Sequence, residues 1–168
     1  MKKITVTELS RRADISKTTF YYHYDDIYAV AEEFENELIE QLSAVLSEIS
    51  RGSLSDTFDF GYYTRSIIDF LKENEAGYKM VMGASSPQLF IEKLKKIIAK
   101  KITENISYVP FDSEPEKWEV QICFFTSACV DVAAEYFRGG FSVPFDTVTE
   151  VVLEAVEKLK PKKTPSAD

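Results

Sequence analysis

Apolar residues recur at intervals of three and four along most of this chain, and this period strongly limits the folds that it can adopt. The clearest run contains Ile27, Val30, Phe34 and Leu38 and continues to Gly52. Such spacing places apolar side chains on one face of a helix, whereas a half-buried strand would alternate at every second residue. The sequence contains no competing alternation and no internal repeat. It therefore predicts an all-α protein.

Caps and helix breakers divide the chain into a short head, a long connecting helix and a larger helical body. Asp25 and Asp26 can cap the long helix, and Gly52 can end it. The expected segments are a head at residues 1–26, a connecting helix at 27–50, a body at 51–160 and a disordered tail at 161–168. Further helices are expected over Val6–Ala13, Lys17–Tyr24, Ser55 to about Asn74, Pro87 to Ile102, Glu116–Arg138 and Phe145–Leu159, with chain breaks at Gly77 and Gly83 and a loop over Pro110–Pro115.

Composition and a few special residues exclude several classes of protein. No run reaches the roughly 18 consecutive apolar residues that span a membrane, and Thr5 and Glu8 interrupt the segment where a signal peptide would be apolar. Cys123 and Cys129 lie six residues apart in one expected helix, too far apart for a disulfide, so we expect buried, reduced thiols. With His23 as the single histidine, the sequence offers no ligand set for a structural zinc ion. We therefore expect a cytoplasmic protein without metal, cofactor or membrane contact.

Charge is distributed unevenly along the chain. The net charge is −8, yet residues 1–24 carry five basic side chains against two acidic ones, a net of +3 that leaves −11 for the remainder. A basic head can approach phosphate while an acidic body is repelled by the polyanion. A chance cluster in a short segment would give the same numbers, so charge permits nucleic-acid binding without establishing it.

The head has the spacing of a helix-turn-helix. Thr5 and Glu8 have the sequence pattern of a capping box at the start of the first helix. Asp14 can adopt a turn conformation, Ile15 can fill the junction between the helices, and Ser16 can cap the second helix. The second helix carries hydroxyl, phenol and imidazole groups on most of its sides, which suits a recognition helix in the major groove. A tyrosine-rich surface helix is the alternative interpretation.

The segment from Ile4 to Tyr24, ITVTELSRRADISKTTFYYHY, resembles the DNA-binding signature of the TetR/AcrR family of bacterial regulators. The stretch from Glu135 to Phe141 is weakly similar to the C-terminal domains of one subgroup. The resemblance implies a transcriptional regulator, in particular a repressor, that binds a palindromic operator in double-stranded DNA as a homodimer. It also implies that an unknown small-molecule or protein effector binds the body and changes operator affinity. In such a regulator Lys17 and Tyr22 contact phosphates, Thr18, Thr19 and Tyr21 lie nearest the base edges, Thr5 and Thr7 face the DNA backbone, and His23 either reaches a phosphate or packs on the following helix.

Three departures from the family pattern affect the head. Asp14 replaces the turn glycine, which aspartate can tolerate. Asp25 and its neighbour occupy the place of a common lysine, which removes one phosphate contact. The first family helix, normally placed before the signature, is missing, so Leu9, Ile15 and Phe20 lack one of their covers. We therefore expect a head that is looser than the body, in a chain that is either a truncated form of a longer regulator or docks its head on a partner.

Two further sets of residues are predicted in the body. Aromatic and methionine side chains suit an apolar effector, although the same residues fit a packed core: Tyr62, Tyr63, Phe70, Tyr78, Met82, Phe90 and Phe124. The last two helices are apolar on more than one face, which predicts that they pair with the same helices of a second copy. The predicted interface residues are Ile122, Phe125, Ala128, Cys129, Val132, Val148, Val152 and Ala155.

Catalysis is not expected from this sequence. It contains no convergent acid, base and nucleophile set and no Gly-rich phosphate loop, and the single histidine lies in the expected recognition helix. The remaining alternative is a regulator of the same fold that acts through protein–protein contacts, with weak or lost DNA binding.

Overall fold

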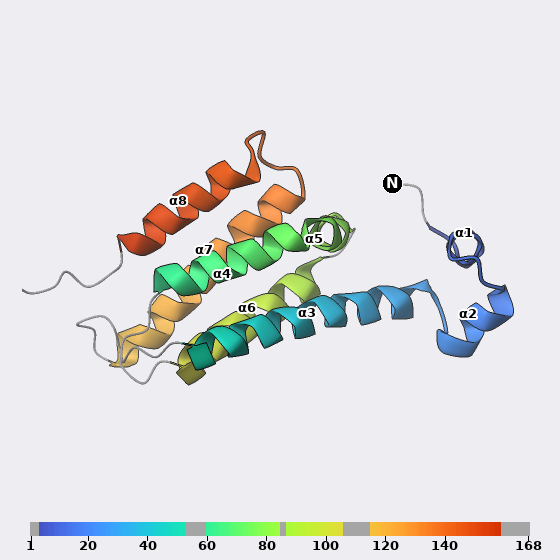
Figure 1. The fold of residues 1–168 in the computed structure, drawn as a ribbon, viewed down its shortest axis with the longest axis horizontal. Coiled ribbons are helices and arrows are strands. Elements are labelled where there is room, and N and C mark those ends of the chain that lie inside the picture. Colours follow the sequence, from blue (N-terminus) through green and yellow to red (C-terminus); the bar gives the residue numbers. More distant parts are fainter. Residues whose placement is uncertain (1–3, 53–59, 85–86, 106–114, 159–168) are drawn as a thin grey trace, which may run out of the picture. The chain divides into compact units, whose positions relative to one another are not determined.

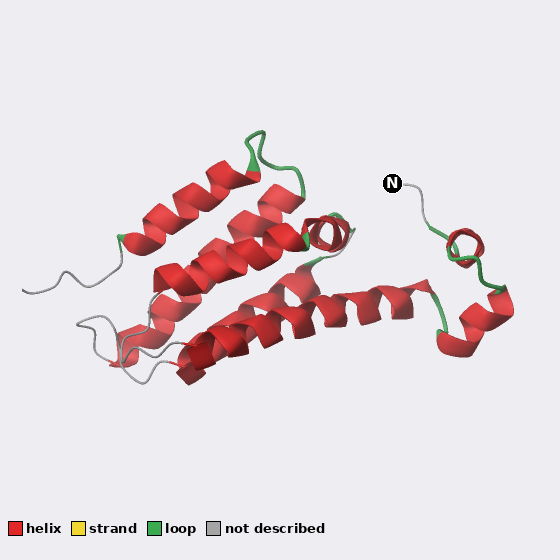
Figure 2. Cartoon of the chain, in the orientation of Figure 1, coloured by secondary structure: helices red, strands yellow, loops and turns green. Residues whose placement is uncertain are grey.

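The computed structural model describes residues 4–52, 60–84, 87–105 and 115–158. These residues form eight helices and no strand, which confirms the all-α prediction (Figures 1 and 2). The helices are α1 (Val6–Arg12), α2 (Lys17–His23), α3 (Ile27–Gly52), α4 (Phe60–Glu73), α5 (Glu75–Met82), α6 (Gln88–Asn105), α7 (Pro115–Phe137) and α8 (Phe145–Glu157). The chain divides into an N-terminal unit, Met1–Leu38, and a C-terminal unit, Ile39–Asp168, and the division falls within α3.

Side-chain caps start the three helices that begin in the N-terminal unit. The Glu8 N–H donates to Thr5 Oγ1 (3.3 Å) at the start of α1, and the Thr19 N–H donates to Ser16 Oγ (2.9 Å) at the start of α2. Asp26 caps α3, because its Oδ1 accepts from the N–H groups of the second and third residues of that helix at 2.8 and 2.9 Å. Each cap satisfies backbone donors that have no partner within their helix. The three predicted caps are therefore confirmed.

The turn between α1 and α2 is a left-handed helix stop. Asp14 has a φ of +55°, and the Ile15 N–H donates to the Ser10 carbonyl at 3.0 Å. This hydrogen bond and the left-handed residue inside it form a Schellman motif, in which glycine is the preferred residue. Aspartate tolerates the conformation because its short polar side chain can bond locally, although it still costs free energy relative to glycine.

Replacing Asp14 therefore tests this turn. We expect Asp14→Gly to stabilise the head by up to about 1 kcal/mol, and Asp14→Val to destabilise it by about 1–2 kcal/mol, because a β-branched residue is strained at positive φ. Native-state hydrogen exchange of the α1 and α2 amides measures both changes. If Asp14→Gly and Asp14→Val destabilised the head equally, the left-handed conformation assigned to Asp14 would be contradicted.

An aromatic cluster forms the centre of one part of the C-terminal unit. In this unit α6 and α5 pack on α7, and α8 packs on both α4 and α7. Tyr78 of α5 is fully buried, and its ring centroid lies 6.3 Å from Phe70, 6.1 Å from Phe90 and 5.8 Å from Phe137. The cluster continues to Phe145 of α8, 5.4 Å from Phe137. Five helices, α4 to α8, thus meet through aromatic side chains, which bury large apolar areas.

Several details of the sequence-based prediction were wrong. Gly77 does not break the chain but lies inside α5, because burial of the neighbouring Tyr78 outweighs the modest helix penalty of one glycine. Cys123 is exposed on α7 instead of buried, and Ile15 is 40% exposed, so it does not fill the junction between α1 and α2. The expected helix start at Ser55, residues 110–114 of the expected loop and the tail at 161–168 lie outside the described residues, whereas Pro115, also expected in the loop, is the first residue of α7.

Candidate nucleic-acid interface and ligand cavity

The second helix of the head presents its polar and aromatic groups to solvent. Lys17, Thr18, Thr19, Tyr21, Tyr22 and His23 are all exposed, and Tyr22 is 84% exposed. Phe20 is the exception on this helix, at 2% exposed. The helix therefore has one anchoring side chain and a solvent-facing surface of hydrogen-bonding groups.

Ring contacts link the aromatic side chains of α2 and its C-terminal cap. The Phe20 ring lies 5.4 Å from Tyr21 in an edge-on arrangement and 5.7 Å from Tyr24. The hydroxyl of Tyr24 is hydrogen-bonded to the Glu33 carboxylate of α3, which raises the pKa of Tyr24. His23 is exposed beside Tyr22, with ring centroids 5.0 Å apart. Tyr21 thus projects from a packed aromatic group, and Tyr24 ties the end of α2 to α3.

The threonines of the head have different local roles. Thr5 uses a lone pair to cap α1, which leaves its hydroxyl hydrogen available to an acceptor such as a phosphate. Thr19 shares a hydrogen bond of 2.8 Å with Ser16 Oγ, so its hydroxyl is oriented by the cap of α2. Thr7 and Thr18 are exposed. These side chains lie at or near the starts of α1 and α2, where backbone N–H groups favour anions.

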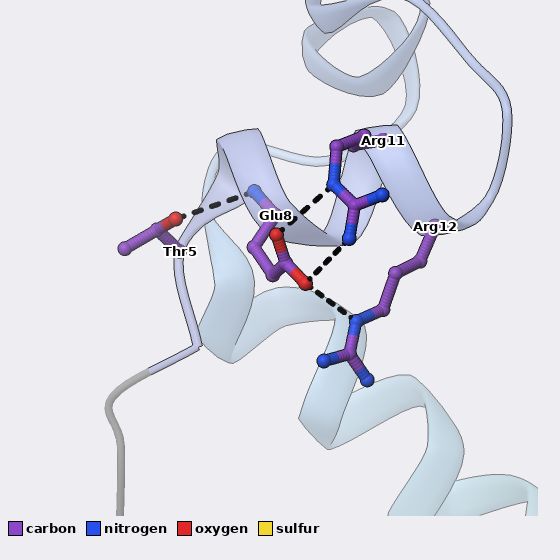
Figure 3. A network of polar contacts seen from close by, with 4 residues as sticks. All are labelled: Thr5, Glu8, Arg11 and Arg12. Carbon is purple, nitrogen blue, oxygen red and sulfur yellow. Dashed lines mark hydrogen bonds and ion pairs between the residues drawn. The ribbon is translucent and has the colours of Figure 1, made fainter.

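Glu8 completes only half of the predicted capping box. Its carboxylate accepts from Arg11 Nε at 3.2 Å, from Arg11 Nη2 at 3.0 Å and from Arg12 Nε at 2.7 Å (Figure 3). These hydrogen bonds, with Arg11 first, lower the pKa of Glu8. Two cationic guanidinium groups attract the carboxylate more strongly than the neutral Thr5 backbone N–H does, because both partners of these hydrogen bonds are charged.

The sequence analysis did not single out Arg11 and Arg12 as contact residues. Both arginine side chains are 70% exposed, so their remaining N–H groups can reach a phosphate. A basic pair in the last turn of α1, directly before the turn to the recognition helix, is the sequence signal that could have identified them.

The C-terminal unit contains an apolar cavity of about 100 Å³. Its lining comes from α3 to α8 and includes Leu42, Tyr63, Met82, Leu94, Thr126 and Val148. Every described lining side chain is uncharged. Burial raises the pKa of Tyr63, and it raises that of Cys129 to about 11, so Cys129 stays a protonated thiol at neutral pH. The cavity is thus an apolar environment inside the helical bundle.

The residues predicted to form an effector pocket fall into three places. Tyr63 and Met82 line the cavity. Phe70, Tyr78 and Phe90 belong to the aromatic cluster, as the alternative of a packed core anticipated. Tyr62 and Phe124 are 57% and 66% exposed.

The residues predicted to form the dimer interface divide between the cavity and the surface. Six of them line the cavity of the single chain: Ile122, Phe125, Cys129, Val132, Val148 and Val152. Ala128 and Ala155 are exposed. The exposed side of α7 also carries Val120 and Phe124, and that of α8 carries Val151.

Helix composition and residue clusters give two further findings. Glu119–Phe137 is long and apolar enough to cross a membrane by length and composition alone, and it is the helix against which α5, α6 and α8 pack. A single helix of this kind is weak evidence for a membrane span. Among the described residues, no group of three His, Cys, Asp or Glu side chains is placed to hold a metal ion.

Comparison with known proteins places the chain in a family. Residues 59–158 match the model of the TetR-type transcriptional regulator C-terminal region. No curated protein and no solved structure gave a match. The matched segment covers more than half of the chain and includes α4 to α8 with the aromatic cluster and most of the cavity lining. The chain belongs to the TetR family of transcriptional regulators.

Proposed function

We propose that this protein binds a palindromic DNA operator as a homodimer, and that a molecule bound in the cavity of the C-terminal unit changes its operator affinity. The observation that carries this proposal is α2, where Phe20 is buried and six polar or aromatic side chains face solvent. A helix of this kind, in a helix-turn-helix, enters the major groove. Repression is the outcome that the resemblance of the head favours.

The contacts of the head divide into those that position the protein and those that read the sequence. Lys17, Tyr22, Arg11 and Arg12 supply exposed donors for phosphates, and Thr5 and Thr7 supply hydroxyls near the start of α1. Such contacts fix the orientation on the duplex without specifying bases. Thr18, Thr19 and Tyr21 project where base edges would lie and carry the discrimination between sequences.

The exposed faces of α7 and α8 are the proposed dimer interface. Val120 and Phe124 are four residues apart on α7, and Val151 and Ala155 are four residues apart on α8, so each pair lies on one helical face. Ala128 extends the α7 face by another turn and permits close helix approach. Paired copies of such faces bury apolar area, which is the main favourable term in association.

Helix α3 offers a route from the cavity to the head. Leu42 lines the cavity, and α3 begins at Ile27, three residues after Tyr24 closes the recognition helix. A ligand that displaces Leu42 acts on a helix that continues into the N-terminal unit. Operator affinity then changes if the ligand binds the DNA-competent and the DNA-incompetent conformations with different affinities.

Two substitutions in α2 test the DNA contacts. We expect Lys17→Ala to weaken binding to all sequences similarly and to reduce the slope of log affinity against log salt by about 1, because it removes one phosphate contact. Thr19→Ala keeps the backbone N–H that Ser16 caps, so the helix stays folded while preference among sequences changes. Operators selected from random duplex DNA, followed by fluorescence anisotropy at several salt concentrations, measure both effects.

Lys96→Ala on α6 is the matched control for Lys17→Ala, because it removes an exposed lysine outside the head. If Lys17→Ala and Thr19→Ala both kept wild-type affinity and selectivity, the recognition-helix assignment would be wrong. A chain that selects no DNA at any salt concentration would instead support the second candidate, a regulator that acts through protein–protein contacts. The exposed aromatic surface of α2 is the feature that such a partner would use.

A further inference from the structure

The cavity lining restricts the charge that a ligand can carry. All described lining side chains are hydrocarbon, aromatic, sulfur-containing or threonine side chains, and none is ionised at neutral pH. Burying an ion without a charged partner costs far more free energy than apolar contacts return. The raised pKa values of Tyr63 and Cys129 reflect the same penalty on charged forms. A charged molecule therefore does not match this cavity.

The Thr126 hydroxyl at the cavity has no hydrogen-bond partner among the described residues. Thr126 is 4% exposed and lines the cavity, and its Oγ1 is unpartnered. Helical threonines commonly donate to a carbonyl of the preceding turn, as Thr103 does to the Ala99 carbonyl at 2.9 Å. Thr149, which also lines the cavity, donates to the Asp146 carbonyl at 2.9 Å. Burial of the Thr126 hydroxyl without a partner thus lowers the stability of the folded protein. A hydrogen bond from a ligand atom would remove this cost.

The cavity volume indicates a small molecule. An apolar protein cavity of about 150 Å³ holds benzene, and the present cavity has about 100 Å³. Water is a poor occupant, because buried water usually makes about three hydrogen bonds and this lining is mostly hydrocarbon. The part of a ligand that lies inside this volume is therefore no larger than about one aromatic ring.

We propose that the cavity takes a small, uncharged, largely apolar molecule that offers one hydrogen-bonding group to Thr126. This inference rests on the proposed function only in treating the cavity as the effector site. Binding to the cavity can be measured without DNA, so its failure is distinguishable from failure of operator binding.

Benzene, phenol and benzoate test the proposal, because they share a ring and differ in hydrogen bonding and charge. They are titrated into the full chain by calorimetry at pH 7. We expect benzene and phenol to bind and benzoate to give no heat of binding. In Thr126→Val, which keeps the side-chain shape, the ratio of phenol affinity to benzene affinity should fall about fivefold, the value of one neutral hydrogen bond. In the matched control Thr149→Val the ratio should stay within about twofold, because that hydroxyl already donates to the Asp146 carbonyl.

A pair of alanine variants locates the binding. Ala133 lines the cavity, so Ala133→Leu should fill it and abolish phenol binding, whereas Ala44→Leu at an exposed position of α3 should not. Thermal unfolding of each variant verifies that it is folded. Benzoate binding as tightly as phenol, or an absence of binding by both neutral probes, overturns the proposed ligand class. An unchanged affinity ratio in Thr126→Val overturns the role of that hydroxyl.

Discussion

Replacing Phe20 with alanine is expected to unfold the head and abolish operator binding while the C-terminal unit stays folded. Phe20 is the sole buried apolar side chain among described residues 4–26, where Ile4 and Ile15 are 58% and 40% exposed. Truncating a buried phenylalanine costs about 3–5 kcal/mol, which is comparable to the whole stability of a small module. The C-terminal unit has its own core around Tyr63, Tyr78 and Phe90, so we expect it to stay folded without this side chain.

Native-state hydrogen exchange distinguishes the two units in this variant. We expect amides of α1 and α2 to lose protection, while those of α7 keep the protection that they have in the wild type. Tyr22→Ala is the control, since that side chain is 84% exposed and its loss should weaken DNA binding without changing head protection. Wild-type operator affinity in Phe20→Ala, or a parallel loss of protection in α7, would contradict the independence of the two units.

The sequence predicted well those features of the fold that depend on neighbouring residues. Thr5, Ser16 and Asp26 act as caps because each satisfies backbone donors within three residues, so neighbouring sequence is sufficient to identify them. The same holds for Asp14, whose position between a helix and a capping serine predicted a turn. The solvent-facing side chains of α2 followed from the polarity of that short helix.

Features that depend on distant residues could not be predicted in the same way. Gly77 lies in a helix because Tyr78 packs against residues of α4, α6 and α7, which the local sequence does not reveal. Periodicity identified apolar faces on α7 and α8, but it cannot tell which face packs within the chain and which remains exposed. Ile122 and Val148 therefore turned out to line the cavity, whereas Phe124 is exposed. Thr126, a polar residue on an apolar helical face, was the available sequence signal for the cavity.

The second large effect is expected from Phe124→Glu, which should convert the proposed dimer into monomers. Phe124 and Val120 are 66% and 69% exposed in the single chain and lie four residues apart on one helical face. Burial of each such side chain contributes about 1.5–3 kcal/mol, and twofold symmetry buries each of them twice. Glutamate at position 124 removes that contribution from both copies. It also places two negative charges, one from each copy, in the buried interface. Affinity for a palindromic operator should fall by about a hundredfold or more, because each monomer then binds one half-site alone.

Leu89→Glu provides the matched control for the dimer interface. Leu89 is 67% exposed on α6, so the substitution introduces the same charge at an equally exposed apolar position outside α7 and α8. We expect it to leave the dimer intact, whereas Ala128→Glu on the Phe124 face should also give monomers. Sedimentation equilibrium measures the oligomeric state of all three variants, and anisotropy with intact and half operators measures the loss of cooperative binding. Dimers that persist in both Phe124→Glu and Ala128→Glu would move the interface away from α7, and monomers in Leu89→Glu would move it to α6.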